Sequence, residues 1–151
     1  MNDLFETIIC QKVAKIFENC NKNVFLFTDK WLNSILNKNI IEKNPAIISQ
    51  GYQYILNMFF DEVGTLQSTS ENLNKDNMFW FGYILTYIQF NYNIAGPELW
   101  NKYEVINALS SADVLHTLSN KIAAETILHD YDKANIAKLK VFGDYMDQQA
   151  N

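Results

Sequence analysis

The sequence contains no arginine: all 12 basic residues are lysines, set against 17 acidic residues, and the formal net charge is −5. Arginine supplies the planar, forked donor that reads guanine edges and clamps phosphates. Net negative charge also repels the phosphate backbone of nucleic acids. We therefore expect no direct binding to DNA or RNA, and a protein partner with a basic surface is easier to accommodate.

Glycine and proline are also scarce, with 5 and 2 residues in a chain of 151. Such a sequence lacks the tight reversals that a turn-rich β fold needs. Its 48% hydrophobic and 14% aromatic content is typical of a globular protein. We therefore expect an all-α fold, in which residues 1–151 form a single compact bundle of about six or seven helices.

Cysteine occurs only twice, at Cys10 and Cys20. Ten residues of α-helix span about 15 Å, which is too far for a disulfide between them. We expect two reduced thiols and a cytoplasmic protein. The segment Met1–Phe5 is acidic rather than basic and no long apolar run follows it, so no secretion signal is expected.

Apolar residues recur at spacings of three and four along much of the chain, a pattern that predicts amphipathic helices. Asparagine, aspartate, serine and proline mark their starts. The predicted helices are residues 4–20 after Asn2 or Asp3, a helix carrying Trp31 after Thr28 or Asp29, one that opens at Pro45 and reaches Phe59, residues 98–108 after Pro97, and residues 120–148 after Ser119.

Two segments interrupt this pattern. The apolar run 24–27 could be a strand or a packed connector. The polar run 67–77 is the clearest loop and could hinge two halves of the chain. Neither half is large enough to be a comfortable domain alone, so we retain a single domain.

The most aromatic segment spans residues 79–90 and lies in a stretch from Asp76 to Glu98 that contains no other charged residue. A buried strand is one interpretation, because aromatic and β-branched residues favour strands. Twelve residues without a breaker fit a helix better. We expect a central helix near residues 77–93, capped by Asp76 or Asn77 and ended by Gly96 in a left-handed conformation. Its apolar run is too short to cross a membrane.

One face of this helix would carry small or polar residues, including Gly82, Thr86 and Gln89. Gly82 allows a second backbone to approach closely. The Gln89 amide needs hydrogen-bond partners if it is buried. The predicted structural spine of the bundle is formed by Trp80, Gly82, Tyr83, Tyr87 and Gln89.

The run from Phe79 to Phe90 resembles a signature of small, uncharacterised bacterial proteins, aromatic-Trp-x-Gly-aromatic-x-Leu-Ala-Tyr-Tyr-Gln-Trp. Thr86 and Ile88 depart from it, because the family usually has Ala and Tyr there. Weaker similarities are Lys30–Ser34 with the following Asn44-Pro45, and the region of His116. The matching positions of the main run are Trp80, Gly82, Tyr83, Leu85, Tyr87 and Gln89.

Proteins of that family are often encoded in gene clusters that look like toxin–antitoxin or mobile-element modules. The resemblance therefore implies an accessory or antitoxin-like role in a bacterium or its phage. It carries over no catalytic residues.

Candidate catalytic groups are few. Cys10 and Cys20 lie on the apolar face of a predicted helix, which favours buried structural thiols over nucleophiles. His129, Asp130 and Asp132 offer too few ligands for a metal site, and the metalloprotease and phosphate-loop motifs are absent. We expect no catalytic, cofactor or metal residues. An enzyme with an unrecognised carboxylate and histidine site, around Glu62, His116 or Asp130, remains an alternative.

The tryptophans Trp31, Trp80 and Trp100 could pack in the core or lie at an interface. The best interface candidates are Trp100 and Tyr103, with Glu98 and Glu104 beside them. We expect a non-catalytic module that neutralises or escorts a protein partner, such as a basic-surfaced toxin or nuclease. The alternative is a phage-encoded acidic inhibitor of a host defence system. Homo-oligomerisation stays open.

Overall fold

The computed structural model describes residues 3–69 and 72–150, with side chains up to residue 143. The described residues form eleven helices and no strand, which confirms the expected all-α class. In chain order the helices are α1 (Leu4–Glu18), α2 (Val24–Leu32), α3 (Ile35–Ile41), α4 (Pro45–Ile48), α5 (Tyr52–Val63), α6 (Lys75–Asn91), α7 (Gly96–Lys102), α8 (Val105–Leu109), α9 (Ala112–Leu115), α10 (Asn120–Asp130) and α11 (Lys133–Ala150).

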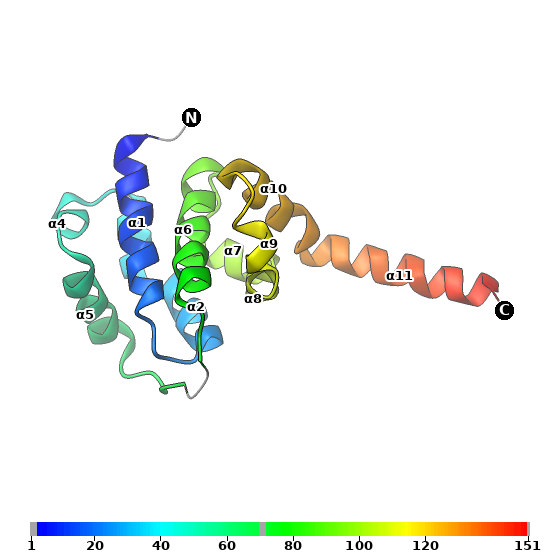
Figure 1. The fold of residues 1–151 in the computed structure, drawn as a ribbon, viewed down its shortest axis with the longest axis horizontal. Helices are drawn as coiled ribbons and strands as arrows, with labels where there is room; N and C mark the ends of the chain where they lie inside the picture. The colour runs from blue at the N-terminus through cyan, green and yellow to red at the C-terminus, as the bar shows by residue number, and fades with distance from the viewer. Residues whose placement is uncertain (1–2, 70–71, 151) are drawn as a thin grey trace.

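Helix α6 is the aromatic segment, and it lies at the centre of the bundle as expected (Figure 1). It packs along α1 in the most extensive helix–helix contact of the described chain, and also touches α3, α8, α9 and α10. Helices α4 and α5 lie on the far side of α1, whereas α7 to α10 lie beyond α6. Asn74 caps α6 by accepting a hydrogen bond from the Asn77 amide, so neither Asp76 nor Asn77 is the cap.

The core is built around an aromatic cluster that includes Trp31, which is 1% exposed. The ring of Phe17 on α1 meets those of Phe27 and Phe81 edge-on at 5.2 and 5.9 Å. Edge-to-face pairs of this kind add roughly 0.5–1.5 kcal/mol each beyond the area that they bury. The cluster therefore joins α1, α2 and α6 into one hydrophobic core.

Three of the five predicted spine residues are buried: Trp80, Gly82 and Gln89. A Cβ atom built on Gly82 would lie 2.8 Å from the side chain of Phe17, so glycine permits the close contact between α6 and α1. Tyr83 and Tyr87 are only half-buried on the same helix. Partial burial raises the pKa of both phenols above the ordinary value, with further contributions from neighbouring groups such as Cys10.

Several predicted boundaries are wrong because caps and tertiary contacts divide the helices differently. The apolar run 24–27 is neither strand nor connector but opens α2, where Asn23 accepts a hydrogen bond from the Leu26 amide. Thr28 therefore lies inside the helix and is fully buried. Pro45 does open a helix, but α4 ends at Ile48 and a separate helix starts after Gly51.

Gly96 does not end the aromatic helix in a left-handed conformation. Asn93 takes that conformation instead, with φ of 52°, and Gly96 begins α7. A Cβ atom on Gly96 would collide with the backbone carbonyl of Leu32, so glycine is needed there for close packing of α7 on the end of α2.

The predicted helices 98–108 and 120–148 are each broken in two. Tyr103 is extended, with φ of −122° and ψ of 145°, and forms an isolated antiparallel bridge with Asp132. The Glu104 amide donates to the Tyr131 carbonyl at 2.8 Å across this bridge. The bridge accordingly separates α7 from α8 and α10 from α11, which is one reason for eleven helices rather than six or seven. Among the described residues, no helix combines the length and apolarity required to cross a membrane.

Candidate functional site

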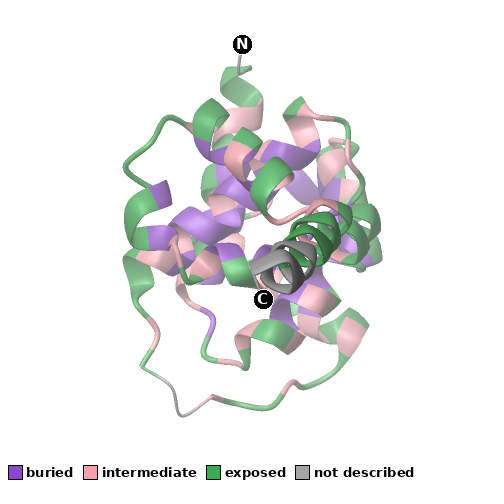
Figure 2. Ribbon diagram, turned by 90° about the vertical axis from the view of Figure 1, so that its right-hand side faces the viewer, coloured by how far each residue is buried: buried purple, intermediate pink, exposed green. Residues whose placement is uncertain are grey.

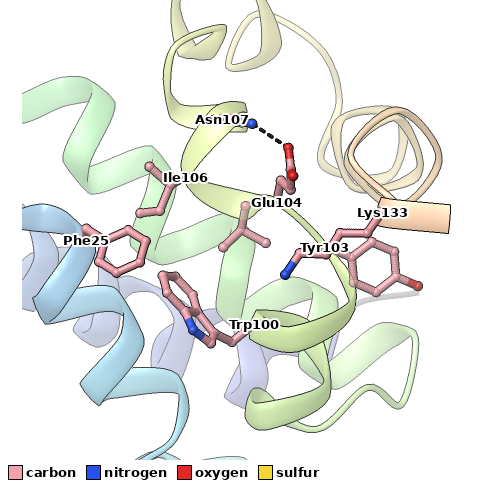
Figure 3. Close-up of a pocket in the computed structure, with 8 residues that line it drawn as sticks. Phe25, Trp100, Tyr103, Glu104, Ile106, Asn107 and Lys133 are labelled. Carbon is pink, nitrogen blue, oxygen red and sulfur yellow. Dashed lines mark hydrogen bonds between the residues drawn. The ribbon is translucent and has the colours of Figure 1, made fainter. Parts of the chain in front are cut away.

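A cleft of about 350 Å³ lies where α2, α7, α8 and the start of α11 meet (Figure 3). Phe25 of α2 and Trp100 of α7 form one wall, with ring centroids 5.0 Å apart and planes at 68°. Phe25 is 55% exposed, although it is a large apolar side chain. Aromatic residues are enriched at protein–protein interfaces, and tryptophan is enriched among the residues that contribute most to binding.

The opposite side of the cleft carries charged groups. The Glu104 carboxylate accepts a hydrogen bond from the side-chain Nδ2 of Asn107 at 2.6 Å, which holds the carboxylate at the edge of the cleft (Figure 3). Lys133, the first residue of α11, directs its ammonium group back into the cleft (Figure 3). The cleft therefore combines an aromatic wall with one carboxylate and one ammonium group.

The structure brings three of the four predicted interface residues together. Trp100, Tyr103 and Glu104 line the cleft, and Tyr103 is 7% exposed. Glu98 is exposed at the start of α7 and lines a different cavity. Sequence reasoning missed Phe25, because the run 24–27 did not show which residues would be exposed.

The cleft adjoins the base of α11, which is firmly attached. The Asp132 carboxylate caps this helix by accepting from the Ala134 and Asn135 amides at 2.8 and 3.2 Å. The Tyr131 hydroxyl lies 2.9 Å from the Ser111 hydroxyl. Together with the Tyr103–Asp132 bridge, these contacts fix the direction in which α11 leaves the body of the protein.

Beyond its base, α11 projects away from the bundle (Figure 1). Its most extensive contact within the described chain is with α10. Leu139, Val141 and Phe142 are 67%, 68% and 61% exposed, and the described part of the helix is coloured largely as exposed in Figure 2. These three large apolar side chains, on the described part of the helix beyond its base, form an apolar surface that the bundle does not cover.

The residues of the enzymatic alternative lie in separate parts of the fold. The Glu62 carboxylate accepts from the Ile35 and Leu36 amides at 2.8 and 3.0 Å and so caps α3. His116 is exposed after α9, and the exposed Asp130 pairs with the neighbouring His129 at 2.9 Å. The geometry therefore brings no carboxylate of this set to the histidine at 116.

Both cysteines are free and buried. Burial, followed by the negative charge of Glu6, raises the pKa of the Cys10 thiol to about 12. Burial also raises the pKa of Cys20. A thiol is nucleophilic only as the thiolate, so these environments favour inert structural roles. No cluster of three or more His, Cys, Asp or Glu side chains with the spacing of a metal site occurs among the described residues.

Several acidic residues have local structural roles at scattered positions. Asp3 caps α1, Glu62 caps α3 and Asp132 caps α11. Glu6 pairs with Lys43 at 3.1 Å. This scatter does not favour imitation of nucleic acid by an acidic face, the mechanism of the phage-inhibitor alternative.

Comparison with protein-family models, with curated proteins and with solved structures found no match.

Proposed function

We propose that the protein is a non-catalytic module that binds another protein, and that α11 is the element it inserts into its partner. The observation that carries this proposal is the exposure of Leu139, Val141 and Phe142 on a helix that leaves the bundle. An amphipathic helix laid into a hydrophobic groove is a recurrent mode of protein recognition. An antitoxin-like or immunity-like component would use it to occlude or escort its partner.

The lack of packing along α11 beyond its base supports this proposal. Isolated helices shorter than about 12–15 residues are marginal in water even when rich in alanine, and most helices in proteins depend on packing of an apolar face. Helix α11 has 18 residues, including Gly143, which weakens a helix, and its residues 137–143 are all exposed. A partner that covers the apolar side chains would supply the missing packing.

The Phe25–Trp100 cleft extends the same surface toward the bundle. Lys133 belongs both to the cleft and to α11, so a partner that grips the helix also reaches the aromatic wall. The net charge of −5 favours partners with a basic surface through long-range attraction. A basic toxin or nuclease would have that character.

The test compares two variants of the full chain with the same change in charge. Leu139→Glu combined with Phe142→Glu removes two apolar contacts, whereas Lys140→Glu alters a position on another face of α11. The tagged wild-type chain is first cross-linked in its native host and the partner is identified. Affinities of both variants for the purified partner are then measured by calorimetry.

Burying a Leu or Phe side chain contributes roughly 1.5–3 kcal/mol, so the double variant should weaken binding by about 10²–10⁴-fold. Lys140→Glu should have a much smaller effect. If the partner is toxic, the wild-type chain should restore growth and the double variant should not. Equal affinities of the two variants, or no specific partner, would refute the proposal.

A further inference from the structure

A second cavity, of about 540 Å³, lies between α3, the end of α6 and the start of α7, and none of the residues that line it belongs to α11. Its volume is within the range of small-molecule sites, roughly 300–1,000 Å³. Apolar side chains supply much of its wall, including Ile41, Ile94 and Pro97. Such cavities bind ligands when a few polar groups converge on the apolar surface.

Two buried amides lie at the floor of this cavity: Asn37 is 1% exposed and Gln89 is 3% exposed. The Gln89 Nε2 group donates to the Leu85 carbonyl at 3.2 Å, so its Oε1 atom faces Asn37. Asn37 Nδ2 donates to that oxygen at 2.8 Å. These two bonds determine the orientation of both amides and leave Asn37 Oδ1 as a buried acceptor without a partner.

Other polar side chains around the cavity form hydrogen bonds within the protein or lie at its exposed rim. The Ser34 hydroxyl donates to the Trp31 carbonyl at 2.7 Å, and Asn33 Nδ2 donates to Asp29. Their donors are therefore used within the protein. Glu42, Glu98 and Lys38 line the cavity from exposed positions at its rim. Two carboxylates and one ammonium group give this rim a net negative charge.

We propose that this cavity binds a small, mostly apolar molecule that carries a protonated amine. The apolar body would fill the space between α3 and α7, and the ammonium group would donate to Asn37 Oδ1 while the rim carboxylates attract its charge. A buried acceptor without a partner is unfavourable, so a donor that reaches it is favoured. Because Asn37 Oδ1 is covered, the side chains around it must shift to admit the donor, while Asn37 Nδ2 keeps its bond to Gln89.

Benzylamine is a suitable probe, with benzyl alcohol and benzoate as neutral and anionic counterparts of the same size. The full chain is titrated with each compound and followed by ¹⁵N–¹H correlation spectra. We expect saturable shifts with benzylamine that are confined to residues 32–42 and 89–98 and include the side-chain amides of Asn37 and Gln89. Benzoate should not bind.

Variants then locate the site. Ala95→Phe introduces a ring from an exposed position on the cavity wall, and Ala46→Phe makes the same change at an exposed position outside it. Ala95→Phe should weaken benzylamine binding at least about tenfold, with an unchanged melting temperature. Ala46→Phe should leave binding intact.

Charge variants test the rim. Glu98→Gln should weaken binding of benzylamine, whereas Lys38→Gln should strengthen it. The proposal is overturned if benzylamine gives no saturable shifts, as expected when water alone serves the Asn37 oxygen. It is also overturned if benzyl alcohol or benzoate binds as well as benzylamine, or if Ala95→Phe binds as the wild type does.

Discussion

Gly82 provides the sharpest test of how the bundle is held together. Its missing side chain lets α6 lie against Phe17 of α1, since a Cβ atom there would be 2.8 Å from the Cβ, Cγ and Cδ1 atoms of Phe17. Carbon atoms normally approach to about 3.5–4.0 Å, so an added methyl group is about 1 Å too close. Phe17 is fully buried and surrounded by other rings, including that of Phe27, which limits its movement.

The magnitude follows from two opposing effects. Alanine favours a helix over glycine by about 1 kcal/mol. Overpacking of a filled core costs typically 1–3 kcal/mol. Gly143 is a matched control, because it lies in a helix and a Cβ atom there would meet nothing within 4 Å. Because the propensity gain is common to both sites, Gly82→Ala should be less stable than Gly143→Ala by about 1–3 kcal/mol.

Thermal unfolding followed by circular dichroism measures this difference. For a chain of this size, 1 kcal/mol corresponds to a shift in melting temperature of about 2–4 °C. Gly82→Leu, which adds three more carbon atoms to the same contact, should lower the melting temperature further than Gly82→Ala. Equal melting temperatures for Gly82→Leu and the wild type would show that α6 does not lie against α1 in this way.

Three other perturbations have defined outcomes. Gly96→Ala should lower the free energy of unfolding in urea by about 1–3 kcal/mol, because the methyl group meets the Leu32 carbonyl. Glu62→Ala should cost about 1 kcal/mol by removing two hydrogen bonds at the start of α3, where Ser34 remains the N-cap, while leaving partner binding unchanged. The pKa of Cys10 is raised in the folded chain, so the associated stability is present below pH 9 and is lost as the pH rises toward 12. The free energy of unfolding should fall less steeply over that range in Cys10→Ala, and equal slopes would contradict the buried thiol.

The central helix was predictable because its signal is local. The run 79–90 contains no residue that ends a helix, and it lies within α6. The close approach of another helix at Gly82 was predictable because glycine has no side chain. The cap at Asn74 was missed because several polar residues stand before the helix, and only the geometry shows which one accepts the Asn77 amide. The predicted need of the Gln89 amide for a partner was correct, but its partner Asn37 lies 52 positions away and no spacing rule identifies it.

The helix breaks could not be predicted, because they depend on contacts distant in sequence. Tyr103 belongs to the apolar stripe of the predicted helix 98–108, and only its bridge with the distant Asp132 shows that the helix ends there. Asp132 did offer a local signal, since aspartate is a strong N-cap residue. The cleft was partly predictable for a similar reason: Trp100 and Tyr103 are large aromatic residues near charges, whereas Phe25 becomes part of it only through tertiary packing.

The Tyr103–Asp132 bridge gives the two halves of the proposed binding surface a common origin. It ends α7 beside Trp100, which places that ring in the cleft, and it starts a new helix at Lys133, which turns α11 out of the bundle. A continuous helix from Asn120 onward would have kept its later residues in line with α10. The break thus exposes an apolar helix next to an aromatic cleft. A partner that bound α11 alone would leave the Phe25 and Trp100 rings exposed to water, whereas a partner that covers both surfaces buries them. Substitutions in the cleft and in α11 should therefore each weaken binding of the same protein.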